Sequence, residues 1–274
     1  FIKNTIANTV GNDLSGLVFC DLFAGTGIVG RTFKPFVKQV IANDVEFYSF
    51  VLNRNYIGNF KKLATQKHID NLNSLNGVEG FIYQNYSENG SEDRLYFSEE
   101  NGRKIDAIRQ QIEIWKNNNE INEDEYYFLL ASLIESADKV ANTASVYGAY
   151  LKKLKKSAQK KLVVGPAKFN ITKNSHQVFN EDGNVLIKKI KGDILYLDPP
   201  YNARQYGSNY HLLTTIAKYD SFEPQGKTGL RAYYRSSYCK KNEVKKSFED
   251  LIKNANFKYI FLSYNNEGLM TENE

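Results

Sequence analysis

The sequence has few of the residues that build disulfide scaffolds or metal centres. Its 274 residues include two cysteines and three histidines. Cys20 and Cys239 are too few for a disulfide framework. The positions of His68, His176 and His211 match no spacing that is typical of metal ligands. We therefore expect no metal site and no histidine-based catalytic triad.

Long apolar segments are also missing. No run of residues is apolar enough to cross a bilayer, and no stretch has the pattern of a signal peptide. We expect a cytoplasmic protein that does not enter a membrane. Because the chain begins with Phe1 rather than methionine, we also expect further residues before it, and we expect the last strands of the sheet to lie beyond its end.

Charge and composition are those of a globular protein with a weak preference for acidic partners. Hydrophobic residues make up 42% of the chain and charged residues 24%, so it can form one large domain or a domain with an insertion. The formal net charge of +5 weakly favours a polyanionic partner. Aromatic residues reach 14%, and a few of them could stack on bases.

The most informative motif is Asp198-Pro199-Pro200-Tyr201, which follows an apolar run typical of a buried strand at residues 194–197. Prolines stiffen a turn and lack N–H groups, so their carbonyls point outward as acceptors. The Asp198 carboxylate is a second acceptor, and the ring of Tyr201 offers a flat face. A planar ring with an exocyclic amino group fits such a site. We therefore predict that these four residues are catalytic.

A glycine-rich segment near the start of the chain could hold a cofactor. Gly25, Gly27 and Gly30 fit the pattern G-x-G-x-x-G between a strand and a helix. A second strand, at residues 39–44, ends in Asp44, at about the distance where a partner for ribose hydroxyls is expected. These features fit both NAD and S-adenosylmethionine, because both present a ribose. The acceptor pair at Asp198 favours S-adenosylmethionine, since hydride transfer has no use for it.

Taken in order, these motifs resemble the Dam-like (alpha-group) DNA adenine-N6 methyltransferases, in particular the branch found in bacterial restriction–modification systems. The matching segments are residues 21–27, 43–44 and 198–201, with further similarity at residues 138–152, 201–211 and 262–268. The resemblance implies a Rossmann-like S-adenosylmethionine-dependent methyltransferase fold with a mostly parallel sheet. It also implies methyl transfer to adenine N6 of a flipped-out base in double-stranded DNA, with a cognate restriction endonuclease as a candidate partner.

The resemblance also indicates which residues hold the cofactor. In this family an acid shortly before the catalytic strand contacts the cofactor's adenine, and Asp182 is the best match, although an Asp-Gly pair is also typical of an ordinary turn. The expected cofactor-binding residues are Asp21, Phe23, Ala24, Gly25, Thr26, Gly27, Asp44 and Asp182.

The predicted organisation is an α/β catalytic domain, residues 1–60 and 166–274, with an inserted, mostly helical target-recognition region at 61–165. Helical spacing predicts a helix between Glu125 and Ala141, and we expect loops and short elements over 61–125. Strands are predicted at 167–171, at 177–179 and, as a buried strand, at 259–264. A helix is predicted at 248–255.

Basic residues in two regions are candidates for contacts with DNA phosphates. Residues 152–161 contain six lysines and no acid, although a solvated lysine-rich face explains this equally well. The segment 226–231 lacks the full spacing of a phosphate-binding loop, so we expect it to meet DNA instead. The predicted DNA-binding residues are Lys152, Lys153, Lys156, Arg204, Tyr206, Lys227 and Arg231.

Other functions remain open at the level of the sequence. The same site could act on cytosine N4 or on adenine in RNA. Methylation of a protein glutamine is disfavoured by Asp198, because that activity is usually associated with asparagine at this position. A catalytically silent nucleic-acid-binding subunit would be expected to lose the glycine loop or the acceptor pair, and both are intact.

Overall fold

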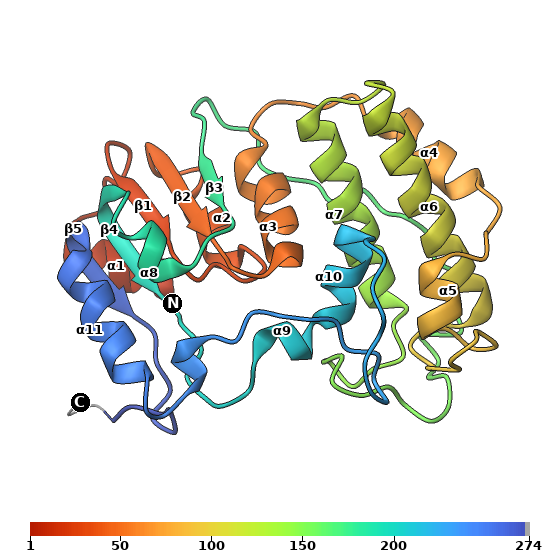
Figure 1. The fold of residues 1–274 in the computed structure, drawn as a ribbon. Coiled ribbons are helices and arrows are strands. Elements are labelled where there is room, and N and C mark those ends of the chain that lie inside the picture. Colours follow the sequence, from red (N-terminus) through yellow and green to blue (C-terminus); the bar gives the residue numbers. More distant parts are fainter. Residues whose placement is uncertain (272–274) are drawn as a thin grey trace. The chain divides into compact units, whose positions relative to one another are not determined.

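The computed structural model describes residues 1–271 and divides the chain into two compact units (Figure 1). The first unit comprises Phe1–Lys62, Lys168–Tyr206 and the chain from Tyr234 onward. The second comprises Leu63–Ala167 and Gly207–Tyr233. Residues 207–233, which the sequence analysis assigns to the catalytic domain, therefore belong to the second unit together with most of the predicted insertion.

The first unit is built on a parallel sheet of five strands, as the α/β prediction requires. The strands are β1 (Val18–Asp21), β2 (Gln39–Asn43), β3 (Gln177–Phe179), β4 (Lys191–Leu197) and β5 (Asn256–Leu262), in the spatial order β3-β2-β1-β4-β5. This arrangement is consistent with a Rossmann-like methyltransferase fold. Parallel strands need crossover connections, and short helices provide most of them here.

The helical segments of this unit are α1 (Ile2–Val10), α2 (Ile28–Phe33), α3 (Phe47–Asn53), the π-helix η1 (Arg54–Gly58), α8 (Gly183–Leu186), the 3-10 helix η2 (Ser237–Cys239) and α11 (Val244–Asn254). The central strand β1 is covered on both faces. Phe19 stacks on Phe33 of α2 at 4.1 Å, while Cys20, as expected, is buried in the opposite cluster with Leu195 and Leu251. Consecutive apolar residues are typical of such a doubly covered strand.

Two strand predictions differ from the structure. Residues 167–171 form no strand; the segment is irregular and Ile171 is 63% exposed. The predicted buried strand at 259–264 is β5, which ends at Leu262 and is an edge strand of the described sheet. Its side chains alternate between exposed and partly buried. A single covered face explains this alternation, because successive side chains point to opposite faces.

The second unit is helical. It contains α4 (Gln66–Ser74), α5 (Phe81–Tyr86), α6 (Glu99–Asn117), α7 (Glu123–Lys139) and α10 (His211–Lys218), while α9 (Tyr206–Asn209) spans the junction. The predicted helix near residues 125–141 is α7, which begins with a capping box formed by Asn122 and Glu125. No helix among residues 1–271 has both the length and the apolar character needed to span a membrane.

The prediction of loops and short elements over 61–125 is wrong for α6, which runs for 19 residues. Asn101-Gly102, a pair of residues that is typical of turns, lies in the first turn of this helix, after the N-cap Ser98. Gly102 is needed there for close packing rather than for a turn. A Cβ atom at Gly102 would lie 1.9 Å from Oγ of the fully buried Ser87.

Gly102→Ala is therefore expected to destabilise the protein by about 1–3 kcal/mol through overpacking. In an unhindered helix the same change stabilises by about 1 kcal/mol, so the sign is diagnostic. Urea unfolding of the variant measures the difference. Gly165→Ala is the matched control, because a Cβ atom there meets nothing within 4 Å. A Gly102→Ala protein as stable as the parent would contradict the packing argument.

Candidate active site

Three aspartates lie at the carboxyl ends of neighbouring strands in the first unit. Asp21 ends β1 and pairs with Ala42 of β2 on one side and Tyr196 of β4 on the other. Asp44 and Asp198 each follow two residues after those partners. Because side chains two residues apart share a face, the register brings Asp44 and Asp198 to either side of Asp21. Open parallel sheets bind ligands at this edge.

Asp21 is the most buried of the three aspartates, with 1% of its surface exposed. The amide of Gly30, in α2, donates a hydrogen bond to its Oδ2 atom at 2.9 Å. Burial, together with the nearby charges of Asp198 and Asp44, raises the pKa of Asp21 to about 7, against the lowering effect of the Gly30 hydrogen bond. The carboxylate therefore lies where a positive ligand charge would stabilise its ionised form.

Asp44 is tied to the glycine loop. Its Oδ2 atom accepts a hydrogen bond from the Gly25 amide at 2.8 Å, and its Oδ1 atom accepts one from the Glu46 amide at 2.8 Å. Burial raises the pKa of Asp44 to about 6, against the lowering effect of these two bonds. Carboxylate oxygens can accept more than one hydrogen bond each, so Asp44 keeps acceptor capacity for a pair of hydroxyl groups.

The glycine loop needs its glycines for different reasons. Gly25 and Gly27 have φ angles of 52° and 76°, in the left-handed region that favours glycine. Gly30 is required by packing instead, because a Cβ atom there would lie 2.7 Å from Cδ1 of Ile57. Gly27 is the N-cap of α2, so the loop leads directly to the positive end of a helix.

The Asp198-Pro199-Pro200-Tyr201 segment directly follows β4. Pro199 is buried, whereas the side chain of Asp198 is exposed. Enough protein nevertheless surrounds this carboxylate to raise its pKa through loss of hydration. The Tyr201 carbonyl accepts a hydrogen bond from the Leu269 amide at 2.8 Å, and its ring meets that of Tyr264 edge-on, with centroids 6.5 Å apart.

Asp182 caps the short helix α8. Its Oδ1 atom accepts hydrogen bonds from the amides of Asn184 and Val185. Its Oδ2 atom accepts one from the hydroxyl of Tyr234 at 2.5 Å. The following residue, Gly183, packs on the ring of Phe23, because a Cβ atom there would lie 3.2 Å from it. Asp182 therefore lies close to Phe23, another predicted cofactor-binding residue. Tyr234 also belongs to this group through its contact with Asp182, which no feature of the sequence predicts.

Comparison with known proteins identifies the family of the chain. Residues 1–274 match the family described as D12 class N6 adenine-specific DNA methyltransferase. The chain belongs to this family. It is 63% identical to the Type II methyltransferase M.NlaIII of Neisseria lactamica over 272 residues, which cover 99% of the chain and 81% of that relative. No solved structure matches it.

This D12 class methyltransferase covers different shares of two further relatives. The Type II methyltransferase M.FokI of Planomicrobium okeanokoites is 44% identical and matches all of the chain, which spans 44% of that relative. The Type II methyltransferase M.CviAII of Paramecium bursaria Chlorella virus 1 is 42% identical, over 93% of the chain and 77% of that relative.

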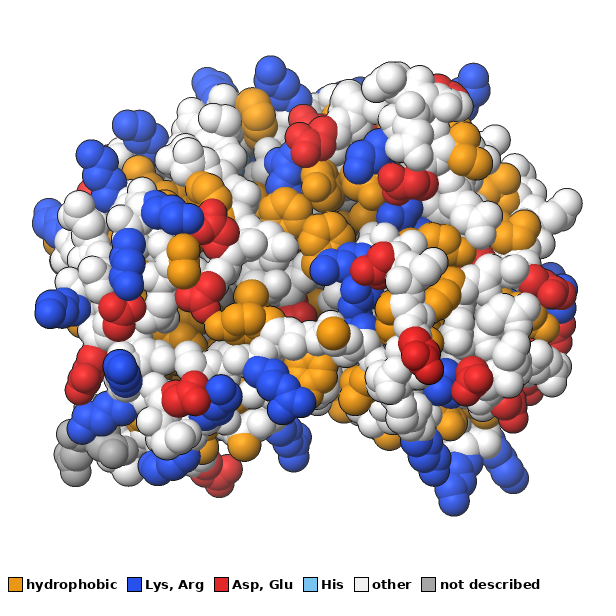
Figure 2. Space-filling view, viewed as in Figure 1, with side chains coloured by type: hydrophobic (Ala, Val, Ile, Leu, Met, Phe, Trp, Pro, Cys, Tyr) orange, Lys and Arg blue, Asp and Glu red, His pale blue; other side chains and the backbone are white. Residues whose placement is uncertain are grey.

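Most of the predicted DNA-binding side chains of this methyltransferase are exposed. Those that are exposed are Lys152, Lys153, Lys156 and Lys227 in the second unit and Arg204 and Tyr206 in the first. Figure 2 shows basic side chains projecting from the loops of the second unit at the bottom of the view. Among residues 1–271, no group of three or more His, Cys, Asp or Glu side chains is arranged to hold a metal ion.

Arg231 is a correction to the predicted DNA contacts. Its side chain is buried, and its two terminal nitrogens donate to the two carboxylate oxygens of Asp220 at 2.9 and 2.7 Å. The guanidinium also lies 4.9 Å from the ring centroid of Phe222. A bidentate pair of this kind uses the donors that a phosphate would need, so Arg231 stabilises the second unit itself.

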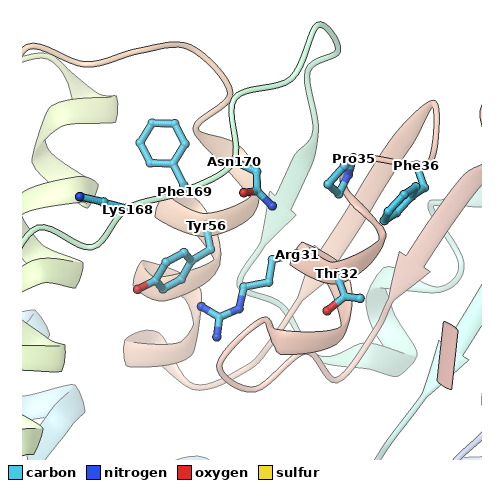
Figure 3. A pocket seen from close by; sticks show the side chains of 8 residues that line it. All are labelled: Arg31, Thr32, Pro35, Phe36, Tyr56, Lys168, Phe169 and Asn170. Atoms are coloured by element: carbon cyan, nitrogen blue, oxygen red, sulfur yellow. The ribbon is translucent and has the colours of Figure 1, made fainter. Parts of the chain in front are cut away.

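The first unit also has a cavity of about 410 Å³ beside α2 (Figure 3). Its lining residues are Arg31, Thr32, Pro35, Phe36, Tyr56, Lys168, Phe169 and Asn170. The Arg31 guanidinium lies 4.5 Å from the ring centroid of Tyr56. None of the three aspartates lines this cavity, so it is distinct from the candidate active site.

The raised pKa of Asp21 gives a pH-dependent prediction. A carboxyl group whose pKa is higher in the folded than in the unfolded protein stabilises the fold at low pH, and this stability is lost as pH rises towards about 7. Asp21→Asn removes the ionisable group but keeps an acceptor for Gly30. We expect the variant to exceed the parent in unfolding free energy by on the order of 2–4 kcal/mol at pH 8, with a smaller difference near pH 4.

Denaturant unfolding between pH 4 and pH 8 measures this difference. Asp13→Asn serves as a control, because Asp13 is an exposed aspartate with a lowered pKa. A difference between Asp21→Asn and the parent that is constant with pH would show that ionisation of Asp21 is not its cause.

Proposed function

We propose that the chain transfers a methyl group from S-adenosylmethionine to N6 of an adenine within a specific sequence of double-stranded DNA. Membership of the D12 class establishes the reaction type. The observation that supports this cofactor and these residues is the placement of Asp198 beside Asp21, Asp44 and the glycine loop. The order of glycine motif, insertion and Asp-Pro-Pro-Tyr motif also favours the alpha group of these enzymes.

The residues at the strand edge fit S-adenosylmethionine in charge and shape. The cofactor carries a sulfonium ion, a ribose diol, an amino acid and an adenine. Asp44 would accept hydrogen bonds from the two ribose hydroxyls, as expected for an acid at the end of β2. The glycine loop gives the backbone close access, and the neighbouring carboxylates of Asp21 and Asp198 favour a cation. Phe23 and Asp182 would contact the adenine, provided that the Tyr234 hydroxyl leaves Oδ2 of Asp182.

The Asp198 and Pro199 acceptors explain how the adenine amino group becomes nucleophilic. Its lone pair is delocalised into the ring, which makes it a poor nucleophile. Hydrogen bonds from its two protons to the Asp198 carboxylate and the Pro199 carbonyl would favour a pyramidal nitrogen with a localised lone pair. When bound, S-adenosylmethionine supplies the activated methyl group. The adenine must be flipped out of the duplex to reach these acceptors, and stacking on Tyr201 would hold it, worth about 1–3 kcal/mol.

We propose further that the enzyme is the modification component of a type II restriction–modification system with a cognate endonuclease. The names of M.NlaIII, M.FokI and M.CviAII, all type II methyltransferases, support this. A DNA substrate is also compatible with the cytoplasmic location expected from the sequence. The exposed lysines of the second unit, Lys152, Lys153, Lys156 and Lys227, are the proposed phosphate contacts, and residues 61–165 the proposed target-recognition region.

Methyl transfer from labelled S-adenosylmethionine to unmethylated genomic DNA, followed by nucleoside analysis, tests the proposal. We expect the label in N6-methyladenine. Label in N4-methylcytosine would overturn the base assignment, and label in RNA alone would overturn the substrate.

Asp198→Ala should lower the turnover rate by on the order of 100-fold or more, because an acceptor that acts in the transition state is lost. Binding of S-adenosylhomocysteine, measured by calorimetry, should remain close to that of the parent. Asp193→Asn is a matched control from the opposite end of β4, where Asp193 accepts a hydrogen bond from the Val18 amide at 2.8 Å. It should retain turnover. Loss of cofactor binding in Asp198→Ala would mean that Asp198 has a structural role.

Cofactor affinity should also depend on pH. A cationic ligand favours the ionised forms of Asp21 and Asp44, whose pKa values are about 7 and about 6 in the free protein. Binding should therefore release protons, and the affinity for S-adenosylmethionine should rise between pH 5 and pH 8. Calorimetry at pH 6.5 in two buffers of different ionisation enthalpy measures the proton release. Proton uptake on binding would contradict the assigned roles.

A further inference from the structure

The side chain of Asn53 is buried and contacts the glycine loop, although Asn53 is not among the site residues predicted from the sequence. It is the last residue of α3 and is completely inaccessible to solvent. Its Nδ2 atom donates one hydrogen bond to the Gly25 carbonyl at 2.9 Å and another to the Ser49 carbonyl at 2.8 Å. The first bond joins α3 to the loop, and the second fixes the side chain to its own helix.

Gly25 is thereby held at both of its backbone groups. Its amide donates to Asp44, just after β2, and its carbonyl accepts from Asn53, at the end of α3. The residue has a φ angle of 52°, so the backbone there is in the left-handed region. Two side chains from one continuous segment, residues 44–53, therefore fix the conformation of the first glycine of the loop.

The other end of the Asn53 amide supports a specific role. Its Oδ1 atom is buried and has no hydrogen-bond partner among the described residues. It lies 2.6 Å from the position that a Cβ atom of Gly27 would take. An unpaired buried carbonyl oxygen costs about 1–3 kcal/mol, and such a cost in a native protein calls for an explanation. Here the side-chain amide is oriented so that Nδ2 bonds to the Gly25 carbonyl, and this orientation leaves Oδ1 without a partner.

This orientation determines the direction in which the backbone N–H of Thr26 points. In a trans peptide the carbonyl of one residue and the N–H of the next point in opposite directions. Because Asn53 holds the Gly25 carbonyl inward, the Thr26 N–H is directed away from Asn53. Thr26 is exposed, and its amide makes no hydrogen bond with residues 1–271. The loop thus presents an unused backbone donor at Thr26.

We propose that Asn53 is a positioning residue that aims the Thr26 amide at an anionic group of the ligand. On the proposed function, on which this inference rests, that group is the carboxylate of the amino-acid part of S-adenosylmethionine. Asn53 itself lies behind the loop and acts through the Gly25–Thr26 peptide. Its loss leaves the donor in place but frees the peptide to rotate.

The test compares two ligands that share the same nucleoside. S-adenosylhomocysteine has the amino-acid carboxylate, whereas 5′-methylthioadenosine lacks the amino-acid part. In the parent, we expect the first ligand to bind more tightly. In Asn53→Ala this advantage should shrink by about tenfold, the equivalent of one oriented hydrogen bond to a charged group, while the affinity for 5′-methylthioadenosine stays within about twofold. A purely structural role would instead weaken both ligands equally and would overturn the proposal.

Asn55→Ala is the matched control. Asn55 is a buried asparagine two residues away, and its Oδ1 atom accepts a hydrogen bond from the Asn59 side chain at 3.3 Å. This variant should lose stability but keep the preference for S-adenosylhomocysteine. In methylation assays, Asn53→Ala should raise the KM for the cofactor while kcat at saturation changes little.

A ligand-free measurement separates this inference from the proposed function. The amides of Gly25 and Gly27 donate to Asp44 and Ala24, so they should be protected from hydrogen exchange. Asn53→Ala should accelerate their exchange, and Asn55→Ala should not. If the parent binds neither ligand and exchange is still faster in Asn53→Ala, the proposed cofactor would be refuted. The role of Asn53 in fixing the Gly25–Thr26 peptide would nevertheless stand. Unchanged exchange in Asn53→Ala would overturn the inference, whatever the ligand.

Discussion

The parallel register of β1 with β2 and β4 is the constraint on which the candidate site depends. Asp21 faces Ala42 and Tyr196 across the ladder, so Asp44 and Asp198, two residues further along, come to the same edge. A slip of one residue in either ladder would turn the corresponding carboxylate to the opposite face. The apolar residues that lock this register, such as Phe19, Val40 and Leu195, therefore determine the chemistry without taking part in it.

Bringing three carboxylates to one edge costs stability in the free protein. Burial raises the pKa of Asp21 and Asp44, and the mutual repulsion of the carboxylates adds to the effect at Asp21. The Gly30 amide and the Gly25 amide offset part of that cost by donating to them. Such a strained group of like charges is typical of a site that binds a cation, because the ligand supplies the missing countercharge.

The features predicted correctly from the sequence are those with a local signature. The apolar runs before Asp21 and Asp198 predicted β1 and β4, and the glycine spacing predicted the loop between β1 and α2. The differences between prediction and structure have a common physical origin in tertiary contacts. Gly102 belongs to a helix because it packs on Ser87, Arg231 is buried because Asp220 lies opposite, and residues 207–233 pack with the second unit. No local sequence pattern predicts such tertiary partners.

The residues that sequence reasoning missed support the predicted site from outside its motifs. Asn53 is one of many asparagines in the chain, and its bond to the Gly25 carbonyl becomes apparent only in the structure. Tyr234 is likewise distinguished only by its hydroxyl on Asp182. Both act on groups that the motifs supply, Asn53 by fixing a peptide and Tyr234 by occupying a carboxylate oxygen. A motif therefore identifies which atoms meet the ligand, whereas the fold determines which way those atoms point.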